Sequence, residues 1–250
     1  MQRFPAQFSD FADPRRLARL CGQASLKSQR QRFVWLPALI PPARALAAVT
    51  LLERRLGEFL RPMRRDIDRS TITGMRENFT EALPKTMSNR SIMLNDKYAP
   101  SGRAAARIGL LDMLGSASLR DFTQRVCGRK LADNAGFQAI RYETGDYVGP
   151  HNDHHPEDEN LRGGYVDVQI TLSNAAVARQ YLICEQAGYL NRVASVGVRS
   201  GVSVSYLPFW HQVTPLEARR GEEAAARRWL LLASFEIASP ARPARRPRRR

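Results

Sequence analysis

The sequence predicts an α+β fold, in which a helical N-terminal half packs against a double-stranded β-helix, or jelly-roll, core. Two observations support this prediction. Before residue 135, apolar residues recur at three- and four-residue steps, which is the period of an amphipathic helix. After residue 135, short segments rich in β-branched and aromatic residues alternate with glycines and polar turns. Seven or eight such strands in a chain of 250 residues are typical of a sandwich or jelly roll.

The first sixty residues divide into three parts. Residues 1–30 are polar, carry scattered arginines and show no clear period, so we expect a poorly structured lead-in. The segment RFVWLPAL (32–39) has the composition of a buried strand. The segment IPPARALAAVTLLERRLGEFL (40–60) predicts a helix, because Pro41 and Pro42 suit a helix start. The apolar face of this helix consists of Leu46, Val49, Leu52, Leu56 and Leu60.

Two further helices follow a stretch without a clear pattern. Residues 61–100 include the turn-rich segment PKTMSNRS and predict no definite element. The segment GRAAARIGLLDML (102–114) predicts a helix. Another helix is expected to start at Ser118, with Asp121 three residues on in a capping-box arrangement. We interpret 31–134 as a mainly helical support region of the same domain.

The C-terminal half predicts the jelly-roll core over 135–239. The expected strands include FQAIRY (137–142), YVDVQITL (165–172), QYLICE (180–185), VSVSYL (202–207), HQVTPL (211–216) and RWLLLASFEI (228–237). In 165–172 one face of the strand carries Asp167, Gln169 and Thr171, and the other carries the apolar residues Val166, Val168, Ile170 and Leu172.

The chain is strongly basic, with a formal net charge of +15 from 39 Lys and Arg against 24 Asp and Glu. Only four of the basic residues are lysine, a bias as compatible with codon composition as with an acidic partner. Part of the excess lies in 240–250, where proline and repelling charges predict a disordered basic tail. Nucleic acid is a candidate partner through this tail, but it is not favoured.

Cysteine use and hydropathy bear on the compartment. Cys21, Cys127 and Cys184 lie far apart, which argues against a disulfide framework and favours a reducing compartment. No apolar run approaches the roughly 18–20 residues that span a bilayer. The N-terminus also lacks the apolar stretch of a secretory signal. We therefore expect a cytoplasmic protein with no membrane partner.

Three of the four histidines lie in the short acidic segment after Pro150. His151 and Asp153 are two residues apart, so in an extended strand both side chains would share a face. The remaining histidine, His211, opens a predicted strand and is the candidate third ligand. Two histidines and one carboxylate form the facial triad of non-haem Fe(II) oxygenases. His154 and His155 are competing ligand candidates, and a solvated acidic loop is the alternative to a cation site.

The segment YETGDYVGPHND (142–153) resembles the prolyl-hydroxylase-like branch of the Fe(II)- and 2-oxoglutarate-dependent oxygenases. That family runs a tyrosine, a glycine-containing turn, a second tyrosine and then His-x-Asp. A strand ending in a polar turn follows, here YVDVQITLSN (165–174), and then the distal histidine, here in LPFWHQVTPL (207–216). A basic residue opens the last core strand, here Arg228. FVWLPALIPPARALAAVTLLE (33–53) resembles the family's opening strand and helix.

The resemblance covers about 135–237 well and 32–60 loosely. It departs from the family in two places. The gap between the distal histidine and the basic residue is longer than usual, and EARRGEEAAA (217–226) is interpreted as an inserted surface loop. The stretch 175–201 lacks the family's usual Gly-Gly-x-Thr/Leu turn, which leaves the strand order there open.

The resemblance implies a role for each candidate site residue. The iron ligands, which are also the catalytic residues, would be His151, Asp153 and His211. Arg228 would pair with the distal carboxylate of 2-oxoglutarate, because a guanidinium binds a carboxylate bidentately. Arg220 and Arg227 are alternatives for this role. Tyr142 would line the cosubstrate pocket, with Thr171 as a weaker candidate.

The implied activity is an Fe(II)- and 2-oxoglutarate-dependent dioxygenase that hydroxylates a peptidyl or amino-acid-like substrate and releases succinate and CO2. Its partners would be dioxygen and a peptide or small molecule, with ascorbate a further candidate cofactor. One alternative is the same chemistry on alkylated nucleic acid. The known demethylases of that type carry a second arginine six residues after the first, and here that position is Ser234. The other alternative is a non-enzymatic binding module on a degenerate jelly roll.

Overall fold

The computed structural model of the chain describes residues 1–23, 33–67, 86–153, 164–186 and 189–238. The helices are α1 (Phe8–Phe11), α2 (Pro14–Gln23), α3 (Pro42–Leu56), the 3-10 turn η1 (Gly57–Phe59), α4 (Pro100–Arg107), α5 (Leu110–Leu114) and α6 (Ala117–Cys127). The strands before residue 152 are β1 (Phe33–Pro37), β2 (Arg61–Asp66), β3 (Thr86–Met93), β4 (Leu131–Tyr142) and β5 (Tyr147–His151). The later strands are β6 (Tyr165–Ser173), β7 (Val177–Arg179), β8 (Tyr181–Gln186), β9 (Tyr189–Gly197), β10 (Gly201–Leu207), β11 (His211–Val213), β12 (Glu217–Ala218) and β13 (Arg228–Ile237).

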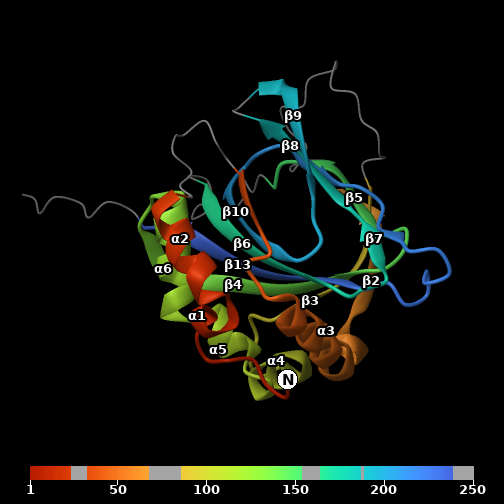
Figure 1. Cartoon of the computed structure of the whole chain (residues 1–250), viewed down its shortest axis with the longest axis horizontal. Coiled ribbons are helices and arrows are strands. Elements are labelled where there is room, and N and C mark those ends of the chain that lie inside the picture. Colours follow the sequence, from red (N-terminus) through yellow and green to blue (C-terminus); the bar gives the residue numbers. More distant parts are fainter. Residues whose placement is uncertain (24–32, 68–85, 154–163, 187–188, 239–250) are drawn as a thin grey trace, which may run out of the picture.

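The strands build the expected jelly roll. One wall has the strand order β10-β6-β13-β4 and the other has the order β5-β11-β8-β9, and all the pairings are antiparallel. Among these eight strands, those that follow one another in the chain lie on opposite walls, except for the β8–β9 hairpin, while β7 and β12 form a separate pair. This winding is that of a double Greek key. A short pairing of β3 with β5 joins the two walls, so the sheet curls into the nearly closed barrel of Figure 1.

The helices cover the outer face of the first wall, as Figure 1 shows. On β6 the alternate residues Val166, Val168, Ile170 and Leu172 are fully buried, in one cluster with the apolar residues of α3 and α6. Burying each such side chain contributes about 1.5–3 kcal/mol. The other β6 residues therefore point into the barrel, as the alternation in the sequence predicts.

The expected lead-in is wrong for residues 1–23. This stretch forms α1 and α2, and Phe4, Phe8 and Phe11 are at most 2% exposed within the main core. The Phe4 backbone N–H also donates to the Ile108 carbonyl, at 2.7 Å. The phenylalanines anchor the segment, since each large aromatic ring removes a large apolar area from water. Residues 24–30 and the basic tail 240–250 lie outside the described residues.

Strands also occur where the sequence predicts turns or helical support. The segment PKTMSNRS falls largely in β3, which pairs with β2, β4 and β5. In contrast, the strand predicted at 32–39 is confirmed as β1, which extends the first wall beside β10. Sheet pairing outweighs the weak local preference of the polar residues in β3, because strand propensity depends on context.

The helices largely match their predicted ranges, with three differences of detail. The 102–114 helix is split into α4 and α5 at Gly109, whose φ of +74° is left-handed. The N-cap of α6 is Ser116, whose hydroxyl accepts from the Leu119 N–H, so the prediction of Ser118 is wrong by two residues. Leu46 is 51% exposed, so it lies outside the buried face of α3. No helix in the described ranges is long and apolar enough to cross a bilayer.

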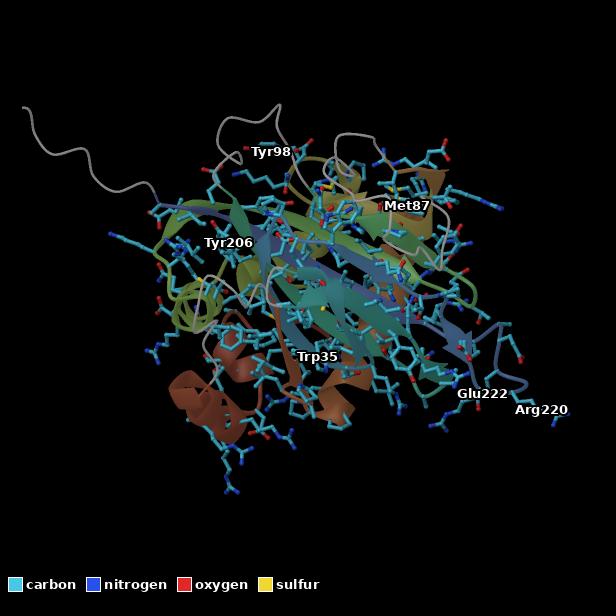
Figure 2. All side chains as sticks on the ribbon, turned by 90° about the horizontal axis from the view of Figure 1, so that it is seen from above. Trp35, Met87, Tyr98, Tyr206, Arg220 and Glu222 are labelled. Atoms are coloured by element: carbon cyan, nitrogen blue, oxygen red, sulfur yellow. The ribbon has the colours of Figure 1, made fainter. Side chains whose placement is uncertain are left out.

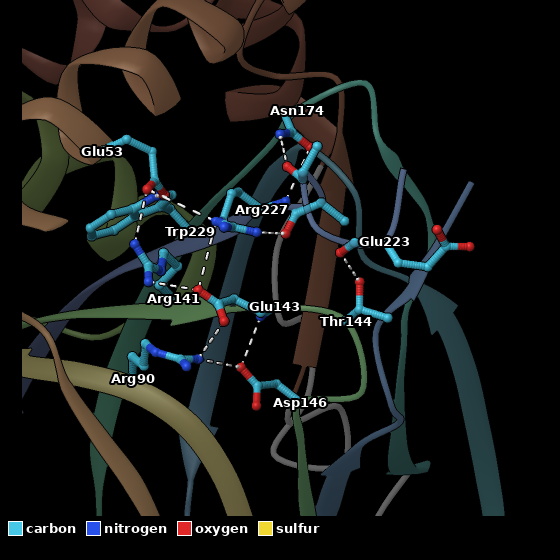
Figure 3. A network of polar contacts seen from close by, with 12 residues as sticks. Glu53, Arg90, Arg141, Glu143, Thr144, Asp146, Asn174, Glu223, Arg227 and Trp229 are labelled. Atoms are coloured by element: carbon cyan, nitrogen blue, oxygen red, sulfur yellow. Dashed lines mark hydrogen bonds and ion pairs between the residues drawn. The ribbon is translucent and has the colours of Figure 1, made fainter. Parts of the chain in front are cut away.

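A polar network joins the support helix α3 to the barrel (Figure 3). The Glu53 carboxylate accepts from Trp229 Nε1 at 2.6 Å and from Arg141 Nη1 at 2.9 Å. Arg141 also donates to Glu143 at 2.6 Å, and Glu143 pairs with Arg90 at 2.7 Å. The network therefore fixes α3 against β13, β4 and β3 on the outer side of the wall.

Candidate active site

Two histidines meet where β5 pairs with β11. His151 is the last residue of β5, His211 is the first of β11, and the two are register partners. Their ring centroids lie 4.2 Å apart, and the residues are 8% and 9% exposed. Strand pairing therefore brings together two imidazoles that are far apart in the sequence.

Asp153 joins the two rings from just beyond the end of β5. Its Oδ1 lies 3.4 Å from His151 Nε2, and its Oδ2 lies 3.4 Å from His211 Nε2. This position of the carboxylate does not come from the predicted strand alternation, because Asp153 lies outside the strand and has a left-handed φ of +53°. Asp is among the few residues that adopt this conformation readily. The turn, and not a shared strand face, aims the carboxylate at the imidazoles.

The second nitrogen of each ring is engaged by backbone. His151 Nδ1 donates to the Gly149 carbonyl at 2.8 Å, and His211 Nδ1 donates to the Phe209 carbonyl at 2.9 Å. Such hydrogen bonds set the tautomer and leave the Nε2 lone pair free to bind a metal. Burial, and then the neighbouring His151, lower the pKa of His211 to about 4, so its imidazole is neutral at physiological pH.

One ligand atom from each of the three residues lies within 4.8 Å of the others. Two imidazoles and a carboxylate are the donor set of mononuclear non-haem iron sites. The free Nε2 atoms, the aspartate between them and their burial all fit a divalent transition metal. The competing candidates His154 and His155 lie outside the described residues.

The three residues line a cavity of about 430 Å3 inside the barrel, which is in the size range of small-molecule sites. Arg228, the first residue of β13, lines the same cavity and is only 3% exposed. Its Nη1 donates to Gln180 Oε1 at 2.9 Å, and its guanidinium lies 4.9 Å from the centre of the Tyr142 ring. Burial lowers the pKa of Arg228 to about 10.

Arg228 is suited to bind a carboxylate guest. Its Nε is buried without a hydrogen-bond partner, and the guanidinium forms no ion pair within the described ranges. A buried charge without a counter-charge is unfavourable, so an anion that enters the cavity would be stabilised there. A chelating acid such as 2-oxoglutarate, which carries a second carboxylate, fits this arrangement of donors.

Gln180 is a site residue that the sequence did not reveal. It is fully buried, and its Nε2 donates to the carbonyls of Asp146 at 3.1 Å and Thr214 at 2.8 Å. Because the amide nitrogen is held by two acceptors, Oε1 must face Arg228. The turn that supplies one acceptor contains Gly145, whose φ of +85° explains the glycine in the sequence motif. No local pattern marks Gln180, which lies just before β8.

The remaining predicted residues separate into those inside and those outside the cavity. Tyr142 is 2% exposed, and burial raises the pKa of its hydroxyl, so it is a neutral phenol. Thr171 Oγ1 lies 3.5 Å from Arg228 Nη2. Arg227 instead points to the outer network, 3.7 Å from Glu143. Figure 2 shows Arg220 on a projecting loop, as expected for the insertion 217–226.

No family model matches the chain, and no curated protein matches it by sequence. Its fold matches solved structures across nearly the whole chain. A prolyl-4-hydroxylase from Pseudomonas putida is 15% identical, with a TM-score of 0.52, over 89% of this chain and 100% of that one. A 2OG-Fe(II) oxygenase family oxidoreductase from Burkholderia pseudomallei is 17% identical, with a TM-score of 0.55, over 90% and 92% of the two chains.

A third match is SnoN, a non-haem α-ketoglutarate-dependent epimerase from nogalamycin biosynthesis. It is 13% identical, with a TM-score of 0.54, over 90% of this chain and 84% of SnoN. The chain therefore has the fold of the 2-oxoglutarate- and Fe(II)-dependent oxygenases, and the resemblance seen in the sequence is confirmed at the level of the fold.

Proposed function

We propose that this protein is an Fe(II)- and 2-oxoglutarate-dependent dioxygenase that hydroxylates a peptidyl or amino-acid-like substrate. One observation carries the proposal: the same cavity of the barrel is lined by a His-Asp-His cluster and by a buried arginine that has no ion pair among the described residues. The oxygenase fold supports this chemistry, and the prolyl-4-hydroxylase among the similar structures supports the substrate class.

In this proposal the His151, Asp153 and His211 side chains hold iron. Arg228 binds the distal carboxylate of 2-oxoglutarate. When bound, iron and 2-oxoglutarate supply the oxidation of a substrate C–H bond by dioxygen, with release of succinate and CO2.

The protein's own contribution is position, charge and exclusion of water. Asp153 supplies one negative charge to the cation, and the neutral His211 need not lose a proton to bind it at pH 7. Gln180 fixes the direction of the Arg228 guanidinium, which lies over the Tyr142 ring, and the neutral Tyr142 hydroxyl would serve as a donor for the cosubstrate. The barrel walls keep these groups nearly dry, which strengthens each polar contact.

The test is a turnover screen with iron loaded under anaerobic conditions. Succinate release is measured with peptides, free amino acids and oligonucleotides, in the presence of ascorbate. Wild-type protein should bind about one equivalent of iron and release succinate, and both should be lost in His151→Ala and in His211→Ala. His155→Ala is the control for the competing ligand, and it should retain iron. Folded wild-type protein that neither binds iron nor turns over 2-oxoglutarate would end the proposal.

A further inference from the structure

A second buried ionisable side chain lines the cavity, and the proposed chemistry gives it no task. Asp167 lies on β6, on the face that points into the barrel, and it is 4% exposed. Its cross-strand partners are Ser234 on β13 and Ser205 on β10. The carboxyl group is therefore surrounded by short side chains that leave space in front of it.

The Asp167 carboxylate is only partly satisfied. Ser234 is a hydrogen-bond partner, but Oδ1 has none among the described residues. Within the same ranges no arginine or lysine forms an ion pair with it. Burial raises the pKa of Asp167 to about 8, and the nearby Asp153 adds to this effect. Asp167 is therefore largely protonated at pH 7 in the empty cavity, and a guest that brings a positive charge would favour its ionised form.

Asp167 lies well away from Arg228. Ser234, its partner on β13, follows Arg228 by six residues, a separation of about 20 Å along a strand. Arg228 and Asp167 therefore mark distant parts of one cavity. Asp167 is also close to the metal cluster, because the neighbouring Tyr165 hydroxyl donates to the Asp153 carbonyl at 3.2 Å.

We propose that Asp167 is the recognition group of the substrate subsite and binds an ammonium group of an amine-bearing substrate, such as a free amino acid. This inference deepens the proposed function and rests on it for the identity of the reaction. An ammonium group matches the site in two ways: it donates to the free Oδ1, and its charge compensates the buried carboxylate. Gln169 and Ser203, which also line the cavity, add polar partners beside it. A neutral hydroxyl or amide would not favour the ionised carboxylate in this way.

Binding is measured by calorimetry on the full chain, metal-free and with Mn(II), so that the result does not depend on turnover. The probes are the free amino acids, putrescine and agmatine, each compared with its N-acetylated form. Some of the cationic probes should bind the wild type, and the acetylated forms should bind much more weakly. In Asp167→Asn the affinity for those amines should fall ~10- to 100-fold, the usual range for a charged hydrogen bond. The affinity for 2-oxoglutarate should not change.

Two further variants make the result specific. Asp167→Glu keeps the carboxylate and should retain amine binding more than Asp167→Asn does. Asp112→Asn, an exposed carboxylate on α5, should behave as wild type. The inference is overturned if no amine binds, if the acetylated forms bind equally well, or if Asp167→Asn binds as wild type. The comparison of amine with acetylated probe needs only the wild type, so it decides the question even if the variants misfold. A wild type that binds amines but never forms succinate would refute the proposed function and leave this site standing.

Discussion

Arg228→Met should separate cosubstrate binding from folding. The wild type holds this guanidinium in a buried site, where its pKa falls from the ordinary value to about 10. That difference corresponds to about 3 kcal/mol of unfavourable charge burial. Because the folded pKa is the lower one, this destabilisation is present at all pH values below about 10. A carboxylate that pairs with Arg228 would recover the energy on binding.

The Arg228→Met substitution removes the gain in binding free energy that a carboxylate obtains by pairing with the buried guanidinium. We expect the affinity for 2-oxoglutarate to fall by two orders of magnitude or more, since about 1.4 kcal/mol is a factor of ten. The free energy of unfolding without ligand should change by less than about 2 kcal/mol, because relief of the buried charge offsets the unsatisfied Gln180 Oε1.

The assay is calorimetric titration of Mn(II)-loaded protein with 2-oxoglutarate, together with urea unfolding of the ligand-free protein. Arg220→Met and Arg227→Met are the matched controls, since the sequence left both open as alternatives. Both should bind 2-oxoglutarate as wild type does. The reasoning is refuted if Arg228→Met binds normally, or if one of the control variants loses binding instead.

Three further outcomes follow from the same contacts. Gln180→Leu should weaken 2-oxoglutarate binding by ~10-fold through the lost hydrogen bond to Arg228, with metal affinity unchanged in a Mn(II) titration. Glu53→Ala should lower the free energy of unfolding by about 1–3 kcal/mol, measured in urea, because it leaves the fully buried Trp229 N–H without its acceptor. His211 has a folded pKa of about 4, below its unfolded value of about 6.5, so the unfolded chain takes up a proton that the folded protein does not. The free energy of unfolding is therefore unaffected by His211 above pH 6.5 and decreases as the pH falls to 4. Metal-free wild type should therefore lose about 3 kcal/mol more than His211→Asn between pH 7 and 4.

Each of these outcomes has a control. Arg54→Ala, an exposed change on the same helix α3, should alter stability by no more than about 0.5 kcal/mol, in contrast to Glu53→Ala. A Gln180→Leu protein that binds Mn(II) more weakly would show that the change disturbs the whole barrel. Equal acid sensitivity of wild type and His211→Asn would contradict the assignment of a neutral buried imidazole.

Local patterns predicted the elements that carry the site. The alternation in 165–172 identified β6 and its outward apolar face, and RWLLLASFEI matches β13 over its full range. The His-x-Asp spacing and the isolated His211 identified the cluster, although a turn and not a strand presents Asp153. Patterns of this kind succeed because side-chain periodicity is a local property of the backbone.

Residues 1–23 and β3 show where local reasoning failed. Phe4, Phe8 and Phe11 are spaced as i, i+4 and i+7, which fits a helix, but so short a pattern does not reveal the surface of α5 and α6 on which they are buried. The polar β3 forms a strand because β4 and β5 supply its hydrogen bonds. Both depend on partners that are distant in the sequence.

By itself the sequence determined which residues could make a 2-histidine-1-carboxylate site and that His211 opens a strand. Only the tertiary structure decided that Arg228, and not Arg220 or Arg227, faces the cavity. It alone placed Gln180 against that arginine and left Asp167 with a free carboxyl oxygen. The physical reason lies in β13, where Trp229 and every second residue after it pack against the helices outside the barrel. The residues between them, which start with Arg228, therefore face the cavity. Polar side chains that face the interior from different strands share one cavity only after strands far apart in the chain have paired.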